Sequence, residues 1–219
     1  MAKMVKGSNQ AKEWCSEFGK EYTDRNTLSL DKLDGLYKTN YGITRLQLNK
    51  LFLSKFSRDI RILEVGSNTG NQLLLLQKMG FKNLWGIEIN NYAVENSKKR
   101  TKDINIIKAS AFDIPFRDGY FDLVFTSGVL IHLAPEYLLQ AIKEIHRCSR
   151  QYIWGFEYYS PACEEIVYRG KKSLMWKNNF PKVYTDAFKD LKLRQTKFCK
   201  YMQDNNTDVM FLLKKNAAK

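Results

Sequence analysis

The chain has 219 residues, of which 44% are apolar, and it carries a formal net charge of +13. This size suits one globular domain with room for a small appendage. No run of the sequence approaches the roughly 18 to 20 apolar residues that a membrane span needs, and the basic, polar start lacks the apolar core of a secretory signal. We therefore expect a soluble protein of the cytoplasm.

The cysteines and histidines are widely separated along the chain. No C-x-x-C pair occurs, and His132 and His146 lie fourteen residues apart. Because zinc sites need closely spaced ligands, we expect no bound metal and reduced, packed thiols. The net charge favours acidic partners such as nucleic acid, anionic glycans or nucleotide-linked sugars. Because the lysines are dispersed, a generally solvated basic surface is the simpler interpretation.

In chain order, the N-terminal part carries the weakest pattern. Residues 1–20 show no clear period and are expected to be poorly ordered or weakly helical, and 17–26 is aromatic and charged. Residues 40–56 place apolar side chains on one broad face and are predicted to form a helix. We therefore divide the chain into an N-terminal extension, 1–40, and a main domain, 41–219.

Strands and helices then alternate along the chain. Buried strands are predicted at 59–65, 83–89, 104–110, 120–128 and 151–159, and helices at 69–80, 91–100 and 135–149. A further helix at 184–191 precedes an antiparallel pair of strands at 191–202 and 207–215. This order predicts an α/β fold: a Rossmann-like, seven-stranded, mostly parallel sheet with helices on both faces and an antiparallel C-terminal strand pair. The interruption at 160–181 is long for a loop, and we interpret it as an insertion that covers an active site.

The stretch ILEVGSNTG, residues 62–70, predicts a ligand-binding turn after the first strand. Gly66 and Gly70 are spaced G-x-x-x-G, whereas a dinucleotide fingerprint needs G-x-G-x-x-G, which disfavours NAD and FAD. Glu88 ends the second strand, where a carboxylate can accept hydrogen bonds from both hydroxyls of a ribose. Glu64 could accept from a ligand amino group. An amino-acid nucleoside fits this combination, and S-adenosylmethionine is such a molecule.

Three successive motifs resemble those of class I S-adenosylmethionine-dependent methyltransferases: ILEVGSNTG, GIEIN and ASAFDIPFRDGYFDLVFTSGVLIHL. The resemblance covers residues 58–158 and implies S-adenosylmethionine as cofactor and S-adenosylhomocysteine as product. It implies that the cofactor is bound by Glu64, Gly66, Ser67, Gly70, Glu88, Ile89, Ser110, Ala111, Phe112 and Thr126. Many family members carry Asp where Ser110 stands. A serine hydroxyl can also accept from the adenine amino group, with weaker selectivity.

The flanking segments resemble a sugar-modifying branch of these enzymes. EFGKEYTDRN, GVLIHL and EYYSPACEEIVYRGKK are similar to a pattern of the methylase group associated with pseudaminic acid biosynthesis, and WKNNFP departs from it. A weaker resemblance links the chain to methyltransferase domains in glycan-building proteins of large algal viruses. These resemblances imply O-methylation of a sugar hydroxyl in glycan biosynthesis, on a nonulosonic acid or on a deoxysugar such as rhamnose. The acceptor would be a sugar, a nucleotide-sugar or a glycan.

A hydroxyl is a poor nucleophile until its proton leaves, so two residues are candidates for a catalytic base. His132 follows the fourth strand and is otherwise a packed side chain in an apolar loop; Glu157 ends the fifth strand and is otherwise a structural acid. Arg25 is expected to reach the methionine carboxylate of the cofactor, as part of a lid formed by the extension. Substrate contacts are expected from Tyr22, Tyr158, Tyr159, Tyr168 and Arg169.

Two other functions stay open at the level of sequence. The net charge of +13 suits an RNA methyltransferase, although TSGV stands where enzymes that methylate adenine nitrogen carry D/N-P-P-Y/F. Nucleic acid is therefore the less favoured partner. A non-enzymatic module that binds S-adenosylmethionine would keep the same donor residues.

Overall fold

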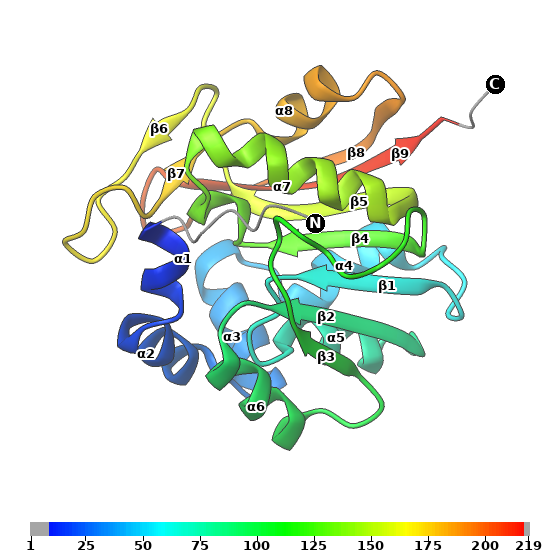
Figure 1. Cartoon of the computed structure of the whole chain (residues 1–219), viewed down its shortest axis with the longest axis horizontal. Coiled ribbons are helices and arrows are strands. Elements are labelled where there is room, and N and C mark those ends of the chain that lie inside the picture. The colour runs from blue at the N-terminus through cyan, green and yellow to red at the C-terminus, as the bar shows by residue number, and fades with distance from the viewer. Residues whose placement is uncertain (1–8, 217–219) are drawn as a thin grey trace.

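The computed structural model describes residues 9–216, so the first eight residues of the N-terminal extension lie outside the described range (Figure 1). Its helices are α1 Asn9–Trp14, α2 Glu17–Asn26, α3 Leu30–Tyr41, α4 Arg45–Leu53, α5 Asn71–Lys78, α6 Asn91–Arg100, the 3-10 helix η1 Leu130–His132, α7 Pro135–Cys148 and α8 Phe180–Ala187. Its strands are β1 Arg61–Val65, β2 Asn83–Glu88, β3 Asn105–Lys108, β4 Phe121–Ser127, β5 Ser149–Tyr158, β6 Glu164–Glu165, β7 Trp176–Lys177, β8 Leu191–Lys200 and β9 Thr207–Lys215. Within this range no helix combines the length and hydropathy that crossing a membrane requires.

Seven strands form one sheet in the order β3-β2-β1-β4-β5-β9-β8 (Figure 1). The first five are parallel to one another, whereas β9 lies antiparallel between β5 and β8. The short strands β6 and β7 pair separately. The predicted Rossmann-like fold with an antiparallel strand pair is confirmed.

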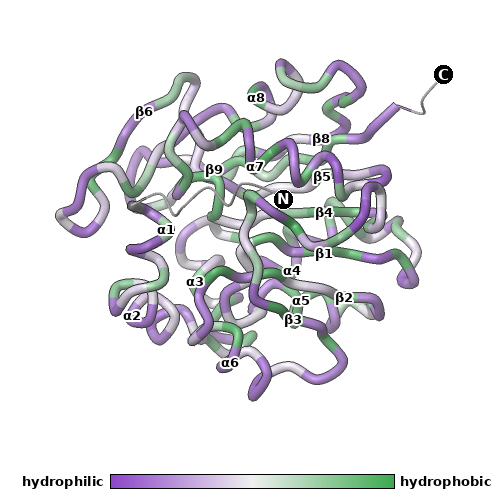
Figure 2. The backbone as a smooth tube through the Cα atoms, in the orientation of Figure 1, coloured by the Kyte–Doolittle hydropathy of each residue, from purple (hydrophilic) through white to green (hydrophobic). Residues whose placement is uncertain are grey.

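Two apolar clusters cover the two faces of the sheet. Ile142 and Ile145 of α7 are buried in one cluster, and Leu73 and Leu76 of α5 are buried in the other. Figure 1 shows α7 in front of the sheet and α5 behind it, and Figure 2 shows hydrophobic residues along the central strands. Because helices occupy both faces, a ligand has to bind at the edge where the parallel strands end.

The N-terminal extension is more helical than the sequence pattern indicates. The helix predicted over 40–56 starts too early, because Gly42 ends α3 in the left-handed region at φ 71° and Thr44 begins α4 through a capping box with Gln47. The prediction contained no helix at α3. Among the residues of α3, all of them described, Leu33 alone is buried, so the sequence carries little periodic signal there.

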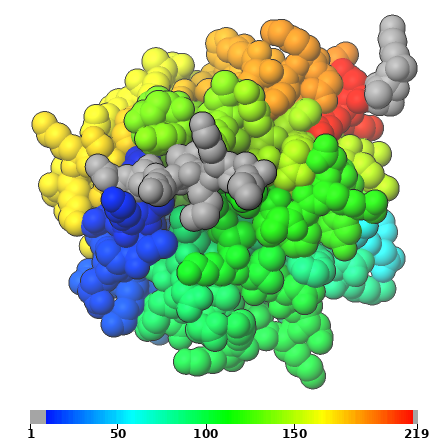
Figure 3. All heavy atoms as spheres, viewed as in Figure 1, coloured from blue at the N-terminus to red at the C-terminus, as the bar shows by residue number. Residues whose placement is uncertain are grey.

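The insertion at 160–181 is partly packed onto the domain. Its C-terminal half buries Leu174, Met175 and Trp176. The side-chain amide of Gln10 donates to the carbonyl of Ser173 at 3.1 Å, which joins α1 to the insertion. Figure 3 shows the two segments, blue and yellow, meeting at the surface.

The helix predicted at 184–191 begins four residues earlier, at Phe180. Asn179 caps it by accepting from the N–H of Lys182 at 3.2 Å, and Pro181 stands in its first turn. Both features favour a helix start, and they displace the boundary that hydrophobic spacing alone predicts.

Candidate active site

A cavity of about 440 Å³ lies at the carboxyl ends of the parallel strands. Its walls come from the ends of β1, β2, β4 and β5, from the turn after β3, from the start of β9 and from α1–α3. Twelve of the residues implicated by the sequence line it: Tyr22, Glu64, Gly66, Ser67, Glu88, Ile89, Ser110, Ala111, Phe112, His132, Glu157 and Tyr158. The fold therefore gathers candidate cofactor, substrate and catalytic residues in one place.

The turn after β1 brings backbone close to the cavity. The N–H groups of Gly66 and Ser67 donate to the carbonyl of Ile87 at 2.8 and 3.0 Å. Gly66 has a φ of 72°, and a Cβ there would lie 2.6 Å from Cγ2 of Val129, so only glycine permits this approach. Gly70 does not line the cavity. With a φ of 81° it turns the chain into α5.

Glu88, at the end of β2, is fixed by backbone donors. Its Oε2 accepts from the N–H of Asn68 and its Oε1 from the N–H of Asn90, each at 2.9 Å. Burial raises the pKa of Glu88, and these backbone hydrogen bonds oppose the rise. Each carboxylate oxygen has a second lone pair, so Glu88 can still accept from two hydroxyls of a ribose.

Five polar atoms of residues in the cavity wall are buried without a hydrogen-bond partner among the described residues. They are Oε2 of Glu64, Oγ of Ser67, Oδ1 of Asn68, Oε1 of Gln72 and Nε1 of Trp14. Burial raises the pKa of Glu64 well above its usual range. Because buried polar atoms are rarely left unpaired, the four oxygens fit a ligand that brings donors, such as the ammonium group of S-adenosylmethionine. The residues present thus fit this cofactor.

Side-chain amides line the cavity next to the Gly66 turn. Nδ2 of Asn71 donates to the carbonyl of Asn26 at 2.6 Å, and Nη1 of Arg100 donates to Oδ1 of Asn71 at 2.8 Å. The guanidinium therefore fixes which way this amide points. Sequence reasoning did not assign Asn71, because an asparagine in the first turn of a helix is common for reasons of capping alone.

The part of the cavity nearest β3 is mostly apolar. Ile89, Ala111, Phe112 and Leu133 line it. Oγ of Ser110 accepts from the N–H of Phe112 at 3.2 Å, so this hydroxyl is directed at its own turn. One lone pair of the oxygen is left for an adenine amino group.

Glu157 holds the loop that follows β4. Its Oε2 accepts from the N–H of Val129 at 3.0 Å and of Ile131 at 3.4 Å, and the hydroxyl of Thr126 also hydrogen-bonds to it. Burial raises the pKa of Glu157 to about 7, against the effect of these donors. Thr126 does not line the cavity, so it acts on this loop through Glu157.

His132, in η1, is both packed and directed at the cavity. Its Nδ1 lies 2.9 Å from the carbonyl of Leu174, so Nδ1 carries the proton and Nε2 keeps its lone pair. Burial lowers the pKa of His132 to about 4, which leaves the imidazole neutral at pH 7. Its ring centroid lies 4.6 Å from that of Trp14 and 5.4 Å from that of Tyr168.

Besides Gly70 and Thr126, four of the implicated residues lie away from the cavity wall, namely Arg25, Tyr159, Tyr168 and Arg169. Arg25 pairs with an acid one turn earlier in α2 at 3.6 Å, and it borders a separate surface hollow together with Arg169. Tyr168 packs behind His132, and Tyr159 packs against Phe198 at 4.9 Å between centroids. The structure therefore does not bring Arg25 or Arg169 to the cavity. Within residues 9–216 no group of three potential metal ligands comes together.

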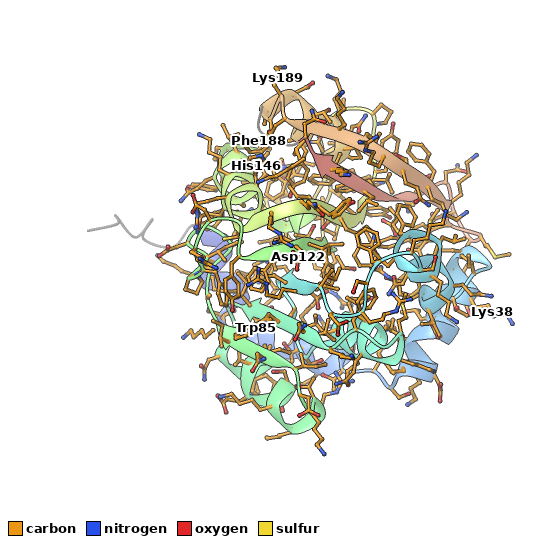
Figure 4. All side chains as sticks on the ribbon, turned by 90° about the vertical axis from the view of Figure 1, so that its right-hand side faces the viewer. Lys38, Trp85, Asp122, His146, Phe188 and Lys189 are labelled. Atoms are coloured by element: carbon orange, nitrogen blue, oxygen red, sulfur yellow. The ribbon has the colours of Figure 1, made fainter. Side chains whose placement is uncertain are left out.

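His146 lies on α7, away from the cavity. Its ring stacks on Phe188 with centroids 4.1 Å apart, and its Nε2 lies 2.9 Å from a carboxylate oxygen of Asp190. Figure 4 labels His146 and Phe188 next to each other. Burial lowers the pKa of His146. These contacts give it a packing role and make it a matched control for His132.

Sequence reasoning missed the end of the cavity that lies beyond β5. Tyr37, Tyr41, Tyr201 and Asp208 line this end together with Tyr158. The hydroxyls of Tyr41 and Tyr201 both donate to Oδ2 of Asp208, that of Tyr201 at 3.1 Å. Burial raises the pKa of Asp208 to about 6. The sequence signal that could have identified this end is Asp208, an acid near the start of β9, which is otherwise mostly apolar.

Comparison with known proteins agrees with the interpretation of the cavity as a binding site for S-adenosylmethionine. Residues 63–152 match the model of a family described as a methyltransferase domain. The O-methyltransferase rstn1 of Aspergillus nomiae is 24% identical over 136 residues, which are 54% of this chain and 60% of that protein. An uncharacterized methyltransferase of Staphylococcus carnosus is 36% identical over 85 residues, 38% of this chain and 39% of that protein. The chain thus spans less than two thirds of the length of these relatives.

A solved structure shares the fold over nearly the whole chain. It is the 1,6-didemethyltoxoflavin-N1-methyltransferase of Burkholderia thailandensis with bound 1,6-didemethyltoxoflavin and S-adenosylhomocysteine, with a TM-score of 0.71, 11% identity and coverage of 99% of this chain and 93% of that one. At this identity the likeness is one of fold. Residues 63–152 thus match a methyltransferase domain, and the cavity at the strand ends fits S-adenosylmethionine as cofactor.

Proposed function

We propose that this protein is an S-adenosylmethionine-dependent O-methyltransferase that methylates a hydroxyl of a sugar in glycan biosynthesis. The observation that carries the proposal is one cavity with two chemically different ends. Glu64 and Glu88 stand at the end nearest β1 and β2, and tyrosines form the end beyond β5. Aromatic faces pack well on the C–H surfaces of sugars, and phenols add hydrogen bonds. The O-methyltransferase relative favours oxygen as the acceptor atom.

The donor is proposed to lie across the ends of β1 and β2. Glu88 would accept from the ribose hydroxyls, Glu64 and Gln72 from the ammonium group, and the amides of Asn26 and Asn71 would face the carboxylate in place of Arg25. S-adenosylmethionine supplies a methyl group that its sulfonium already activates. The protein is left with orientation, exclusion of water and removal of a proton.

His132 is proposed as the base that accepts the proton of the acceptor hydroxyl. Its Nε2 is unprotonated at neutral pH, because Nδ1 is held by the carbonyl of Leu174 at 2.9 Å. Glu157 accepts from the N–H groups of Val129 and Ile131, which belong to the loop after β4, so its proposed role is to position that loop. The proposal thus gives the two candidates different tasks.

The pH dependence of kcat/KM separates these two assignments. With the pKa of His132 lowered to about 4, this base stays unprotonated, and we expect kcat/KM to be flat from about pH 6.5 to 8.5, above the pKa of about 6 to which burial raises Asp208. With the pKa of Glu157 raised to about 7, a glutamate base would be protonated below that pH, and kcat/KM would fall about tenfold per unit there. A fall below pH 7 that disappears in Glu157→Gln would transfer the base role to Glu157.

The extension 1–40 and the insertion 160–181 are proposed to act as a joint cover of the active site. Gln10 bonds to the carbonyl of Ser173, and Lys171 forms an ion pair with Glu13. Both contacts fasten α1 to the insertion above the cavity that α1 and α2 line. A cover of this kind excludes water during methyl transfer.

Calorimetric titration with S-adenosylmethionine and S-adenosylhomocysteine tests the proposal first. We expect both to bind with micromolar affinity. We also expect a sugar or nucleotide-sugar to raise the unfolding temperature of the complex further. The net charge of +13 favours RNA as the rival acceptor. Stabilisation by RNA alone, lost as salt is added, would replace the sugar with nucleic acid. Absence of cofactor binding would overturn the proposal altogether.

A further inference from the structure

We propose that the part of the acceptor that enters the cavity is an uncharged, hydroxyl-bearing ring, bound over β5, β9 and β8, with Asp208 accepting a hydrogen bond from one of its hydroxyls. This inference rests on the proposed function and narrows its substrate class. It follows from the order of the strands, from the side chains at the far end of the cavity and from the charges of its lining.

The order of the strands places donor and acceptor side by side. Glu88 ends β2 and Glu64 lies in β1, whereas Glu157 and Tyr158 end β5. Because β9 is antiparallel, its start lies at the same edge, and Asp208 pairs with Tyr158. Two strand intervals separate β4 from β9, about 10 Å, which is room for one sugar ring beside the methyl donor.

The side chains at this end suit a sugar ring. The ring centroids of Tyr41 and Tyr201 lie 4.8 Å apart, and those of Tyr158 and Tyr201 lie 5.9 Å apart, so aromatic faces surround the carboxylate of Asp208. Both tyrosine donors use Oδ2, and Oδ1 accepts no hydrogen bond from the part of the chain that the structure describes. Oδ1 is therefore available to a ligand hydroxyl.

The charges around the acceptor end disfavour an anionic acceptor. Four acidic side chains line the cavity, those of Glu64, Glu88, Glu157 and Asp208, and the described lining contains no lysine or arginine. Arg45 is buried behind the wall, where its Nη1 donates to the hydroxyl of Tyr37 at 2.8 Å. Lys177 lies over the ring of Tyr158, with Nζ 4.6 Å from the centroid, and donates to Oδ1 of Asn206 at 2.6 Å.

A carboxylate or phosphate of the acceptor at this end would be buried beside the carboxylate of Asp208, and the two cations behind the wall, Arg45 and Lys177, already face that carboxylate, so an anionic acceptor is unfavourable there. A neutral ring meets no such penalty. Among the sugars of the proposed function, this favours a deoxysugar over a nonulosonic acid. It also requires any phosphate of a nucleotide-sugar to stay outside the cavity.

Acceptors that differ only in charge test whether the ring in the cavity has to be uncharged. A methyl 6-deoxyhexoside and a methyl hexuronide of the same ring configuration differ only at C6, which is a methyl group in the first and a carboxylate in the second. We would measure transfer of radiolabelled methyl from S-adenosylmethionine to gluco, galacto and manno pairs, with a 4-amino-4-deoxy glycoside as a cationic member. We expect label in a neutral member only. Label in a hexuronate, or preferential label on the amine, would overturn the inference.

Substitution at the proposed contact tests the residue. Asp208→Asn should lower transfer to the labelled glycoside at least about tenfold, because one charge-assisted hydrogen bond is lost, with S-adenosylhomocysteine affinity unchanged. Tyr201→Phe should give a smaller loss, since it removes one donor to the same carboxylate. Asp204→Asn, on the exposed turn before β9, is the control and should match the wild type. Full transfer by Asp208→Asn would remove Asp208 from the acceptor site.

The outcomes also separate this inference from the function on which it rests. Transfer to sugars regardless of their charge would keep the sugar methyltransferase and overturn the neutral-ring rule. Cofactor binding with no sugar labelled, and label found in RNA, would overturn both. S-adenosylhomocysteine affinity in each variant reports whether the protein is folded, because the donor residues belong to other strands.

Discussion

Replacing Glu88 with alanine is expected to weaken S-adenosylmethionine binding about a thousandfold. Two ribose hydroxyls would lose a buried charged acceptor, and hydrogen bonds to charged groups contribute about 1.5–3 kcal/mol each, so about 4 kcal/mol is at stake. The N–H groups of Asn68 and Asn90 also lose their 2.9 Å partners, which loosens the turn itself. Calorimetric titration with S-adenosylhomocysteine measures the change without turnover.

Two further variants sharpen this measurement. Glu88→Gln keeps one acceptor oxygen and the side-chain shape, so its affinity should fall between those of Glu88→Ala and the wild type. Glu95→Ala removes an exposed acid from α6, where it pairs with Lys98 at 2.7 Å, and should leave affinity unchanged. An affinity of Glu88→Ala within about threefold of the wild type would refute the ribose assignment.

Replacing His132 with alanine is expected to lower kcat about a hundredfold or more, while the affinity for S-adenosylmethionine stays nearly constant. General base catalysis contributes a factor of about 10² to 10⁴, and His132 is proposed to supply it through Nε2. The measurement is steady-state turnover beside calorimetric affinity, with the acceptor that the screen identifies.

The packing of His132 requires a matched variant, because its ring also contacts Trp14 and hydrogen-bonds Leu174. His132→Gln can still donate to that carbonyl but cannot act as a base, so it should be as slow as His132→Ala. Recovery of activity in His132→Gln would instead assign a packing role. His146→Ala, distant from the cavity, should retain wild-type turnover and show at most a lower stability from the lost Phe188 stack.

The parallel sheet could be predicted because strands that are buried on both faces need apolar residues at successive positions. β1, β2 and β4 are such runs, and each is followed by a helix whose start carries a readable cap or turn. The acids at their ends, Glu64 and Glu88, were found because the topology fixes where parallel strands end. These features depend on local pattern alone.

The features that the sequence did not reveal are of two kinds. They depend on which face of a helix a side chain occupies, or on contacts between segments that are far apart in sequence. Tyr22 and Asn26 are four residues apart on α2 and share the face toward the cavity, whereas Arg25 is turned by about 100° from Asn26. No motif marks this difference. Asp208 becomes a site residue only when α3, β5 and β9 meet, since its partner Tyr41 lies 167 residues away in sequence. Such a pairing has no local signature.

The insertion of β9 between β5 and β8 has a consequence for how the two halves of the active site come into being as the chain is made. The strands that carry Glu64 and Glu88 are neighbours in sequence and can pair as soon as each has emerged. The acceptor end has to wait for β9, which follows β8 in the chain yet occupies the place next to β5. Pairings between strands that are far apart in sequence form late. During synthesis, the proposed cofactor-binding end of the cavity would therefore form before the proposed acceptor-binding end.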